Sequence, residues 1–499
     1  MKRTKLPSAQ LDDDALFLRR VRPQARAAPK PKDIYDLVIV GAGPAGLEAA
    51  EWAARRGFSV ALAERAQLGG NSLNAGSVPS KAIIRTAQVQ DGMREADAFG
   101  ATLPKEAPIR LGDTMARMRA IRTRIAVYHS MDDLAALGVD VFFGAARFAD
   151  RQTLVVGAAR LPFRKALVAT GARPRIPDIP GLEDTGYHTS DTIFDIRDLP
   201  GRLAVMGGGP LGCELAQAFC RLGAHVTIVQ DEAKFLPREE RDAAEILSWA
   251  MARDGVEIRL NTAIVAVRRE GDTKILQTLN NGVRGEILAD EILVCTGRAP
   301  NVEELDLAAA GIAFEPGCGI VVNDFLCSTN ADVYAAGDVC LSLMFTNAAQ
   351  SSARMAVRNA LQQAGQRHDD SVIPWCTFCD PEIAHIGLQV WEARKRSIPI
   401  KSYTVMLSDV DRAITDGQET GFVKIHVAEG SDRILGATIV ASRASELINE
   451  MAVVMSTGIG MEALAEVVHT YPAQSGALML AAQAYRRDVD EAVRRSPSG

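Results

Sequence analysis

Two glycine-rich turns hold the residues whose type and spacing point most directly to chemistry. The first turn reads GAGPAG, from Gly41 to Gly46, and the second reads GGGPLG, from Gly207 to Gly212. Both contain the pattern G-x-G-x-x-G. Its first glycine permits a tight turn, its second lets the backbone approach a pyrophosphate, and its third allows a helix to pack closely on a strand. The value of each turn depends on the elements that flank it.

The elements around the first turn are those of a dinucleotide-binding unit. The apolar run Tyr35–Val40 predicts a strand before the turn, and Leu47–Arg56 predicts a helix after it. A second strand is predicted over Ser59–Ala63 and ends at Glu64. The N-terminus of the helix would face the phosphates, and Glu64 would accept hydrogen bonds from ribose hydroxyl groups.

The same arrangement recurs around the second turn. A strand is predicted over Arg202–Met206, a helix runs through Arg221, and another strand is predicted over His225–Val229. Two such units imply two nucleotides that face each other. A second unit that has lost its ligand is the alternative, and the sequence leaves it open.

The nucleotide preference of the second unit is read where its second strand ends. Gln230 takes the place that often holds an acid in NAD enzymes, and Asp231 and Glu232 follow. An acid here favours a free ribose 2′-hydroxyl, whereas a basic cluster favours a 2′-phosphate. The acids therefore favour NADH slightly, while Lys234 and Arg238 keep NADPH open.

Three further segments connect the first unit to a flavin. Ala169–Gly171 (ATG) follows the predicted strand Lys165–Val168, and Cys295–Arg298 (CTGR) follows the predicted strand Glu291–Val294. In Val333–Asp338 (VYAAGD) a strand delivers an acid beside a glycine, where it can bind a polyol chain. Glycine and aspartate are common in turns, so the last segment gains its meaning from the motifs before it.

Size and composition indicate a globular protein of about three domains. The chain has 499 residues, of which 47% are hydrophobic and 24% charged. The net charge of −6 argues against broad nucleic-acid binding, and no apolar run approaches the ~18 residues of a membrane span. Residues 1–32 contain nine Lys or Arg and no apolar signal core, so we expect a solvated arm, or one laid over the first domain, in a cytoplasmic protein.

The cysteines and histidines indicate neither a disulfide nor a metal site. None of the eight cysteines precedes Cys213, and Cys220 lies two helical turns beyond it, too far for a disulfide. Cys376 and Cys379 form a C-x-x-C on a predicted strand, Trp375–Phe378, where residues three apart point to opposite faces. We expect structural thiols, and no metal, because the seven histidines are scattered singly.

The C-terminal region lacks a nucleotide motif and predicts an α+β module. Such a module is suited to forming an interface or capping a substrate. Its predicted strands are Trp375–Ile386, Tyr403–Ser408, Phe422–His426 and Ile434–Ala441, and its predicted helices are Ala444–Thr457 and Met461–Val467.

From Tyr35 to Arg487 these motifs resemble the flavoprotein disulfide reductases, which include glutathione reductase, dihydrolipoamide dehydrogenase and mercuric reductase-like proteins. The stretches that carry the resemblance are GAGPAG, GGNSLNAGSVPSK, ATGARP, GGGPLGCELAQAF, CTGRAPN, YAAGD, WCTFCDPEIAHIG and VHTYPAQSGAL. The resemblance implies an α/β protein with two three-layer Rossmann-like dinucleotide-binding domains and a C-terminal α+β dimerisation domain, acting as a homodimer. It implies an N-terminal arm at 1–32, an FAD domain at 33–185 and 300–370, an NAD(P) domain at 186–299 and an interface domain at 371–499.

The sequence departs from this family where flavin would exchange electrons with a disulfide. The family's segment reads G-G-x-C-x-x-x-x-C-x-P-S-K, and here Ser72 and Ser77 occupy the two cysteine positions. A serine hydroxyl forms no disulfide and does not ionise as a thiol does. An engineered Cys→Ser pair is not excluded by one sequence.

The tail departs in the same direction. Aligned on Pro472, Tyr471 takes the place of the family's catalytic histidine and Gly476 takes the place of its glutamate. His469 lies two residues earlier, and on a strand it would share a face with Tyr471 and be able to contribute a proton. The alternative is a packing role for this histidine.

The residues for flavin reduction are retained. Lys81 follows Ser77 by one helical turn, and in the family this lysine lies by the flavin and pairs with the glutamate that corresponds to Glu214. The candidate catalytic residues are therefore Lys81, Glu214, Tyr471, Ser72, Ser77 and His469. The candidate cofactor-binding residues are Gly41, Gly43, Pro44, Ala45, Gly46, Glu64, Gly70, Asn71, Lys81, Ala145, Thr170, Gly171, Gly337, Asp338, Gly207, Gly209, Pro210, Leu211, Gly212, Gln230, Gly297 and Arg298.

These features predict an FAD-dependent NAD(P)H oxidoreductase whose only redox centre is FAD. Its small-molecule electron acceptor would be a quinone, oxygen, a metal ion, a second nucleotide or another organic molecule. A non-catalytic FAD-binding dimer that serves as sensor or scaffold is one alternative. A thiol or mercury reductase that uses remote cysteines is the other.

Overall fold

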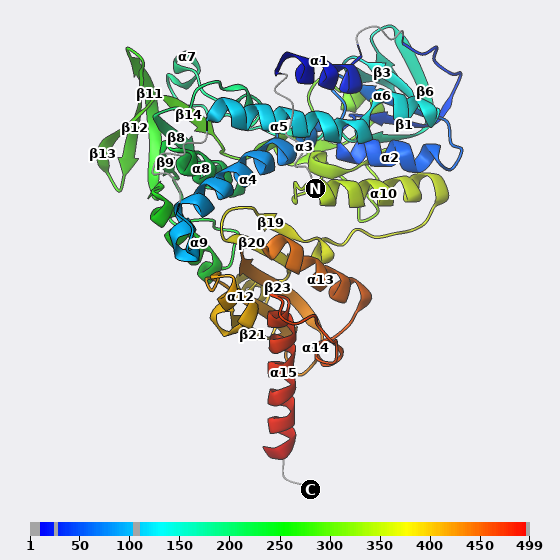
Figure 1. The fold of residues 1–499 in the computed structure, drawn as a ribbon. Coiled ribbons are helices and arrows are strands. Elements are labelled where there is room, and N and C mark those ends of the chain that lie inside the picture. Colours follow the sequence, from blue (N-terminus) through cyan, green and yellow to red (C-terminus); the bar gives the residue numbers. More distant parts are fainter. Residues whose placement is uncertain (1–9, 24–27, 103–109, 496–499) are drawn as a thin grey trace. The chain divides into compact units, whose positions relative to one another are not determined.

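The computed structural model describes residues 10–23, 28–102 and 110–495 of the chain. These residues fold into two compact units (Figure 1). The first unit runs to Asp178 and adds Gly186–Pro200 and Leu293–His368, while the second comprises Ile179–Thr185, Gly201–Ile292 and the chain from Asp369 onwards. Both mix helices with strands, as the sequence predicts.

The first unit is built on a seven-stranded sheet. Its order is β3-β2-β1-β6-β5-β4, with β18 also paired to β6. Strands β3, β2, β1, β6 and β18 pair in parallel, so their carboxyl ends form one edge, whereas β4 and β5 run antiparallel beside β6. The strands are β1 Tyr35–Val40, β2 Val60–Glu64, β3 Asp140–Phe143, β4 Ala146–Asp150, β5 Thr153–Val156, β6 Ala159–Val168 and β18 Val333–Ala335.

Helices and short ladders complete this unit. Helix α2 begins three residues earlier than the predicted helix, because Pro44 fits the first helical position. It packs against α10, which comes from the far end of the unit's sequence (Figure 1). The helices are α2 Pro44–Ala54, α3 Gly70–Asn74, α4 Ser77–Arg94, α5 Leu111–Ile125, α6 Met131–Ala136 and α10 Thr346–Gln362, and the short strands are β7 Ala172–Pro174, β15 Arg298–Pro300, β16 Phe314–Glu315 and β17 Gly319–Ile320.

The described part of the N-terminal arm contains helix α1 (Gln10–Val21), which lies over the first unit. Phe17 is buried, with the Arg122 guanidinium 4.4 Å above its ring, and Arg122 also pairs with Asp14 at 3.2 Å. The carbonyl oxygen of Val21 accepts a hydrogen bond from the backbone N–H of Leu68 at 3.1 Å. Of the two expectations for the arm, the structure supports the one in which it is laid over the first domain.

The second unit begins with a parallel sheet of order β10-β9-β8-β14. A three-stranded antiparallel sheet, β11-β12-β13, lies between its third and fourth strands in sequence. The strands are β8 Arg202–Met206, β9 His225–Val229, β10 Glu257–Arg259, β11 Thr262–Glu270, β12 Thr273–Asn280, β13 Val283–Ala289 and β14 Glu291–Val294, and the helices are α7 Leu182–Thr185, α8 Pro210–Leu222 and α9 Arg241–Asp254.

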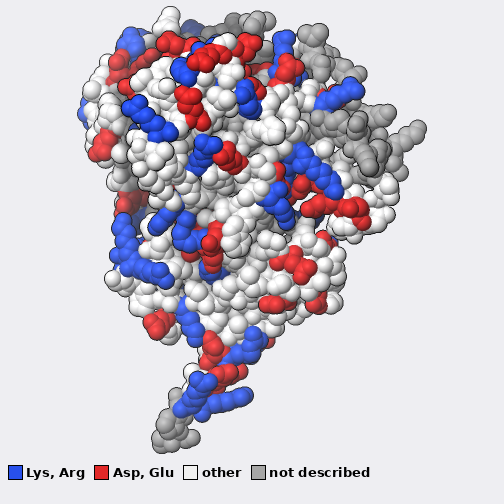
Figure 2. Space-filling model, turned by 90° about the vertical axis from the view of Figure 1, so that its left-hand side faces the viewer, with Lys and Arg blue, Asp and Glu red and all other residues white. Residues whose placement is uncertain are grey.

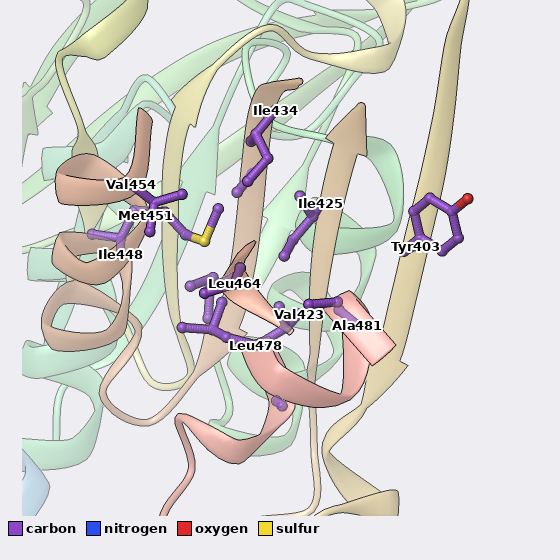
Figure 3. Packing of buried hydrophobic residues seen from close by; sticks show 14 of the residues in the cluster. Tyr403, Val423, Ile425, Ile434, Ile448, Met451, Val454, Leu464, Leu478 and Ala481 are labelled. Carbon is purple, nitrogen blue, oxygen red and sulfur yellow. The ribbon is translucent and has the colours of Figure 1, made fainter. Parts of the chain in front are cut away.

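The C-terminal part of the second unit is an antiparallel five-stranded sheet of order β19-β20-β23-β22-β21. Figure 3 shows side chains of its helices, such as Met451 and Leu478, packed against strand residues such as Ile425. The strands are β19 Trp375–Thr377, β20 Glu382–Gly387, β21 Ile400–Met406, β22 Phe422–Ala428 and β23 Ile434–Ala441, and the helices are α11 Val390–Lys395, α12 Asp411–Thr415, α13 Ala444–Thr457, α14 Met461–Leu464 and α15 Gly476–Arg495.

Four of the predicted C-terminal elements were wrong in extent, among them the strand predicted to end at His426, which continues to Ala428. The predicted strand Trp375–Ile386 is two strands, because Pro381 offers no backbone donor and the chain turns before it. The strand predicted to end at Ser408 ends at Met406, and the helix predicted to reach Val467 ends at Leu464. Cys379 therefore lies beyond the end of β19, and neither it nor Cys376 forms a disulfide.

Buried ion pairs join α8 to the C-terminal sheet within the second unit. Arg221, whose side chain is 2% exposed, pairs with Asp254 at 2.9 Å and with Asp380 at 2.8 Å. The amide of Gln217 donates to Asp254 and to the carbonyl oxygen of Asp380, each at 2.8 Å. Since a buried guanidinium is stable only when paired, this group fixes how α8 meets the strand that follows Asp380.

The pKa values of two adjacent glutamates before α9 are shifted in opposite directions. Burial raises the pKa of Glu239 to about 7, and the bonds from Trp375 and Thr377 oppose this only in part. Burial would also raise the pKa of Glu240, but hydrogen bonds from His426 and from the backbone of Val390 outweigh it and hold this pKa at about 2. The contact between the segment before α9 and strand β19 thus holds one carboxyl that ionises near neutrality.

The surface shown in Figure 2 carries basic and acidic side chains in an interspersed pattern. This distribution fits the small net charge of the sequence. Among the described helices, none is long and apolar enough to cross a bilayer.

Candidate functional site

The first glycine turn connects β1 to α2, and two of its glycines, Gly41 and Gly46, leave no room for a Cβ. Gly41 has a φ of +99°, and a Cβ on it would lie 2.4 Å from the carbonyl oxygen of Ala169. A Cβ on Gly46 would lie 1.8 Å from the carbonyl oxygen of Gly41. Gly43 caps α2 without any side-chain hydrogen bond, so the polar start of this helix is available to a ligand. Pro44 and Ala45 form the first turn of that helix.

Glu64 lies at the end of β2, beside this turn. Its carboxylate accepts hydrogen bonds from the backbone N–H of Ala42 at 2.8 Å and of Ala66 at 2.7 Å. The side chain is therefore held in one orientation where the turn begins. Ala145 is exposed just after β3, next to Gly144, whose N–H donates to the carbonyl oxygen of Glu64.

The segment that carries the two serines packs directly on the glycine turn. A Cβ on Gly70, which has a φ of +55°, would lie 2.6 Å from Cα of Gly43. The N–H of Gly69 donates to the carbonyl oxygen of Ala42 at 2.9 Å, and the amide of Asn71 donates to the carbonyl oxygen of Ala172 at 2.7 Å. The backbones therefore come together as closely as glycine allows.

The threonine of the ATG turn is fixed by a residue that sequence reasoning missed. Asn301 accepts from the Thr170 hydroxyl through its carbonyl oxygen at 2.7 Å, and its side-chain amide donates to the carbonyl oxygen of Thr170 at 2.9 Å. Its own N–H donates to Gly171 at 2.9 Å. The asparagine stands in the stretch CTGRAPN, which was the available signal.

Asp338 follows β18 and Gly337, as the GD motif predicts. Burial raises the pKa of Asp338, and Arg298, whose Nε lies 3.6 Å from its carboxylate, opposes that shift. The Nη2 of Arg298 donates to the carbonyl oxygen of Ala172. Gly297 has a φ of +108° in the turn before Arg298, a conformation that favours glycine. A half-buried acid, a carboxylate at the end of β2 and a crowded backbone cradle fit an extended dinucleotide.

Ser72 and Ser77 stand at the start of two helices. Ser72 lies on α3, and its Oγ accepts a hydrogen bond from the Thr346 hydroxyl at 3.0 Å, at the N-terminus of α10. Ser77 is exposed and opens α4, so the predicted helix that places Lys81 one turn later is confirmed. Nothing in the sequence indicated Thr346. None of the eight cysteines, all of which lie in the described part of the chain, forms a disulfide.

The second glycine turn connects β8 to α8 and is also bounded by a polar side chain. Gly207 has a φ of +100° and donates to Val229 at 2.8 Å. A Cβ on Gly208 would lie 2.3 Å from Oε1 of Gln230, a buried oxygen with no hydrogen-bond partner among the described residues. The amide nitrogen of Gln230 donates to the carbonyl oxygen of Lys234 at 3.0 Å. Gly209, Pro210, Leu211 and Gly212 form the helix start.

Glu214 lies on α8 and is buried. Its Oε1 accepts a hydrogen bond from the backbone N–H of Phe378 at 2.9 Å, just beyond β19. Glu214 belongs to the second unit and Lys81 to the first, so the pairing of these two residues stays a prediction.

The strand-like approach predicted for His469 and Tyr471 was wrong. Residues 467–475 form no strand, and the two side chains do not share a face. His469 is bonded to Glu450 at 2.7 Å, whereas Tyr471 is 79% exposed and donates to Asp411 at 2.8 Å. The chain is irregular here because it turns between α14 and α15 around Pro472.

The fold and these cradles define a class of protein, the two-dinucleotide flavoproteins. A family model described as pyridine nucleotide-disulphide oxidoreductase matches residues 35–364, and its dimerisation domain matches residues 373–482. The chain belongs to the pyridine nucleotide-disulphide oxidoreductase family, whose members bind FAD and depend on NAD(P)H. The dimerisation domain supports a homodimer.

Relatives with known names agree with this membership. The chain is 34% identical to a mercuric reductase of Acidithiobacillus ferrooxidans, over 94% of the chain and 86% of the relative. It is 28% identical to a dihydrolipoyl dehydrogenase of Mycoplasma pneumoniae, over 88% of the chain and 95% of the relative. Among solved structures, LpdA from Mycobacterium tuberculosis superposes with a TM-score of 0.83 at 28% identity, covering 91% of this chain and all of that one. A Cu(II) complex of the HOCl-induced flavoprotein disulfide reductase RclA from Escherichia coli gives 0.80 at 27% identity, with the same coverage.

Proposed function

We propose that this protein is an FAD-dependent NAD(P)H oxidoreductase in which FAD is the only redox centre and the electron acceptor is not a disulfide. The observation that carries the proposal is the pair Ser72 and Ser77 at the positions of the family's two redox cysteines. The Ser72 hydroxyl is engaged with Thr346 at 3.0 Å, and no cysteine precedes Cys213. Two thiols can be oxidised to a disulfide, but two hydroxyl groups cannot undergo this reaction. The serine side chains can therefore hydrogen-bond and shape a pocket but cannot carry electrons.

The residues that would hold FAD are those of the first unit. The start of α2 and the turn before it would receive the pyrophosphate, Glu64 would receive the ribose, and Asp338 would receive the polyol. Bound FAD supplies a two-electron carrier that takes hydride from NAD(P)H. Lys81 would place a positive charge where negative charge develops, and Glu214 would set the position of that ammonium.

The acceptor belongs to one of the classes that accept two electrons without a thiol. Quinones, oxygen, metal ions and a second nucleotide all qualify, and Hg(II) enters the set because relatives are named mercuric reductases. We propose that the acceptor binds where Ser72 and Ser77 meet the Tyr471 of the second subunit. The hydroxyl groups there would bind the acceptor, and FAD would reduce it.

An anaerobic titration with NADH and with NADPH tests this proposal. One equivalent of the preferred nucleotide should bleach the flavin completely, without the long-wavelength band that a thiolate beside flavin produces. The matched variant is Ser72→Cys with Ser77→Cys, which should take up a second equivalent and show that band. Uptake of two equivalents by the unchanged protein would reveal another redox centre and overturn the proposal. If neither nucleotide reduces the flavin, the non-catalytic alternative gains instead.

A further inference from the structure

The segment between α14 and α15 turns its two candidate proton-transfer residues to different surroundings. The His469 side chain is only 6% exposed, and both of its ring nitrogens are engaged. Nδ1 lies 3.0 Å from the carbonyl oxygen of Val467, and Nε2 lies 2.7 Å from Oε1 of Glu450 on α13. Tyr471 is 79% exposed.

These contacts anchor the segment between α14 and α15 through His469. Both neighbours of its ring, the carbonyl oxygen of Val467 and the carboxylate of Glu450, lie within its own domain, so neither ring nitrogen is left to contact an acceptor molecule. Its bond to Glu450 instead ties the segment to α13.

Tyr471 is the side chain that the segment presents to solvent, and it is held by a residue distant in sequence. Its hydroxyl donates to Oδ2 of Asp411, at the start of α12, over 2.8 Å. The hydrogen bond to Asp411, followed by the negative charge of that group, raises the pKa of the Tyr471 phenol. A second tie, from the amide of Gln474 to Oε1 of Gln418 at 3.2 Å, fixes the segment to the residues just beyond α12.

We propose that Asp411 is a positioning residue for Tyr471. It fixes the rotation of the phenol and keeps it neutral, so that the domain presents one oriented hydroxyl oxygen to the electron acceptor. The inference rests on the proposed function, because that function makes Tyr471 the group that meets the acceptor. The His469–Glu450 pair and the Gln474–Gln418 bond hold the backbone beneath it.

The physical reason is the freedom of an exposed tyrosine. An unrestrained side chain samples several rotamers, and binding a ligand in one of them costs conformational entropy. A carboxylate that accepts the hydrogen bond of the phenol removes this freedom in advance and leaves the lone pairs of the phenol oxygen directed outward. Asp411 would thereby favour acceptors that bring a hydrogen-bond donor or a positive charge to that oxygen.

The pairing itself is tested by the ionisation of the phenol, which requires no acceptor. The near-ultraviolet tyrosinate signal of Tyr471 is obtained from the difference between the holoenzyme and its Tyr471→Phe variant over a pH titration. We expect Asp411→Asn to move this ionisation to lower pH, towards that of an ordinary tyrosine, and Asp411→Glu to restore part of the shift. Asp409→Asn removes another exposed carboxylate nearby and should leave the titration unchanged.

The catalytic part is tested by anaerobic steady-state kinetics with 2-amino-1,4-naphthoquinone as the probe, because its N–H group offers the hydrogen-bond donor that the Tyr471 oxygen would accept from. We expect Asp411→Asn to lower kcat/KM for this aminoquinone roughly tenfold, the scale of one lost hydrogen bond to a charged group, and to leave KM for NADH unchanged. The alkaline limb of the pH profile should move to lower pH in the same variant, because the phenol ionises earlier. Asp409→Asn should behave as the unchanged enzyme.

The outcomes separate this proposal from the proposed function. An unchanged Tyr471 titration in Asp411→Asn overturns the pairing, and a shifted titration with unchanged aminoquinone kinetics overturns the positioning role. If the aminoquinone oxidises neither protein although NADH bleaches both flavins, the proposed function fails for quinones. The titration then decides the pairing by itself.

Discussion

Replacing Glu239 by glutamine should remove a pH dependence of stability that arises where the segment before α9 packs on strand β19. The Glu239 side chain lies among Trp375, Thr377 and the neighbouring Glu240, and one of its carboxylate oxygens is buried without a hydrogen-bond partner among the described residues. Burial raises its pKa from 4.5 to about 7. The folded protein therefore holds a proton here in a pH range where the unfolded chain has released it.

The sign and size follow from linkage. Between pH 4.5 and about 7 the native state binds more protons at this site than the unfolded state, so the free energy of unfolding falls as pH rises. At ~1.4 kcal/mol per pKa unit, the full loss is about 3 kcal/mol, complete above about pH 7. The contribution is fully present below pH 4.5, the ordinary value of a glutamate.

The assay is urea unfolding of wild type and Glu239→Gln at about pH 5 and about pH 8, followed by tryptophan fluorescence. The amide stays neutral, so the variant should gain up to about 3 kcal/mol over wild type at the higher pH and far less at the lower one. Glu240→Gln should instead destabilise equally at both values, because a carboxyl with a pKa of about 2 is ionised throughout this window. Glu245→Gln, on the exposed face of α9, is the neutral control. If Glu239→Gln shifted stability by the same amount at both pH values, the assignment of a raised pKa would be refuted.

Three further substitutions test other parts of the structure. Gly70→Ala places a Cβ 2.6 Å from Cα of Gly43 and should lower the FAD content of the purified protein. Gly92→Ala, whose Cβ meets nothing within 4 Å, should leave the FAD content unchanged. Equal FAD content in both variants would contradict the proposal that this turn binds FAD. Arg221→Ala leaves two aspartates unpaired and should cost about 3–5 kcal/mol in urea unfolding, against less than about 1 kcal/mol for Arg412→Ala in an exposed pair, and comparable losses would show that burial does not matter there. Lys81→Met should slow anaerobic flavin reduction by NADH at least roughly tenfold in stopped flow while FAD stays bound, and an unchanged rate would remove this lysine from the site.

Structural features that are set by residues close together in the sequence were predictable. The strands around both glycine turns and the helix that carries Ser77 and Lys81 form as predicted. Elements in the C-terminal sheet were predicted in type, and their ends were missed where a proline or a turn interrupts a hydrophobic run. Local periodicity reports burial, but it does not report where a chain must turn to reach its partner strand.

The partners of the candidate site residues were not predictable, because they are distant in the chain. Asn301 holds Thr170 from 131 residues away, and Thr346 meets Ser72 across 274 residues. Asp411 and Tyr471 are 60 residues apart. Thr346 and Asp411 stand in no motif of their own, and only the tertiary structure brings these residues to their partners.

The sequence by itself determined the two nucleotide cradles and the lack of a redox cysteine pair in the segment from Gly69 to Lys81. Both follow from residue identity: a backbone at positive φ, as at Gly41 and Gly207, favours glycine, and a hydroxyl cannot replace a thiol in a disulfide. Only the tertiary structure decided that His469 is turned inward and Tyr471 outward. The reason is that each side chain takes the orientation in which a distant carboxylate, Glu450 or Asp411, satisfies its hydrogen bond, and no local pattern encodes those positions.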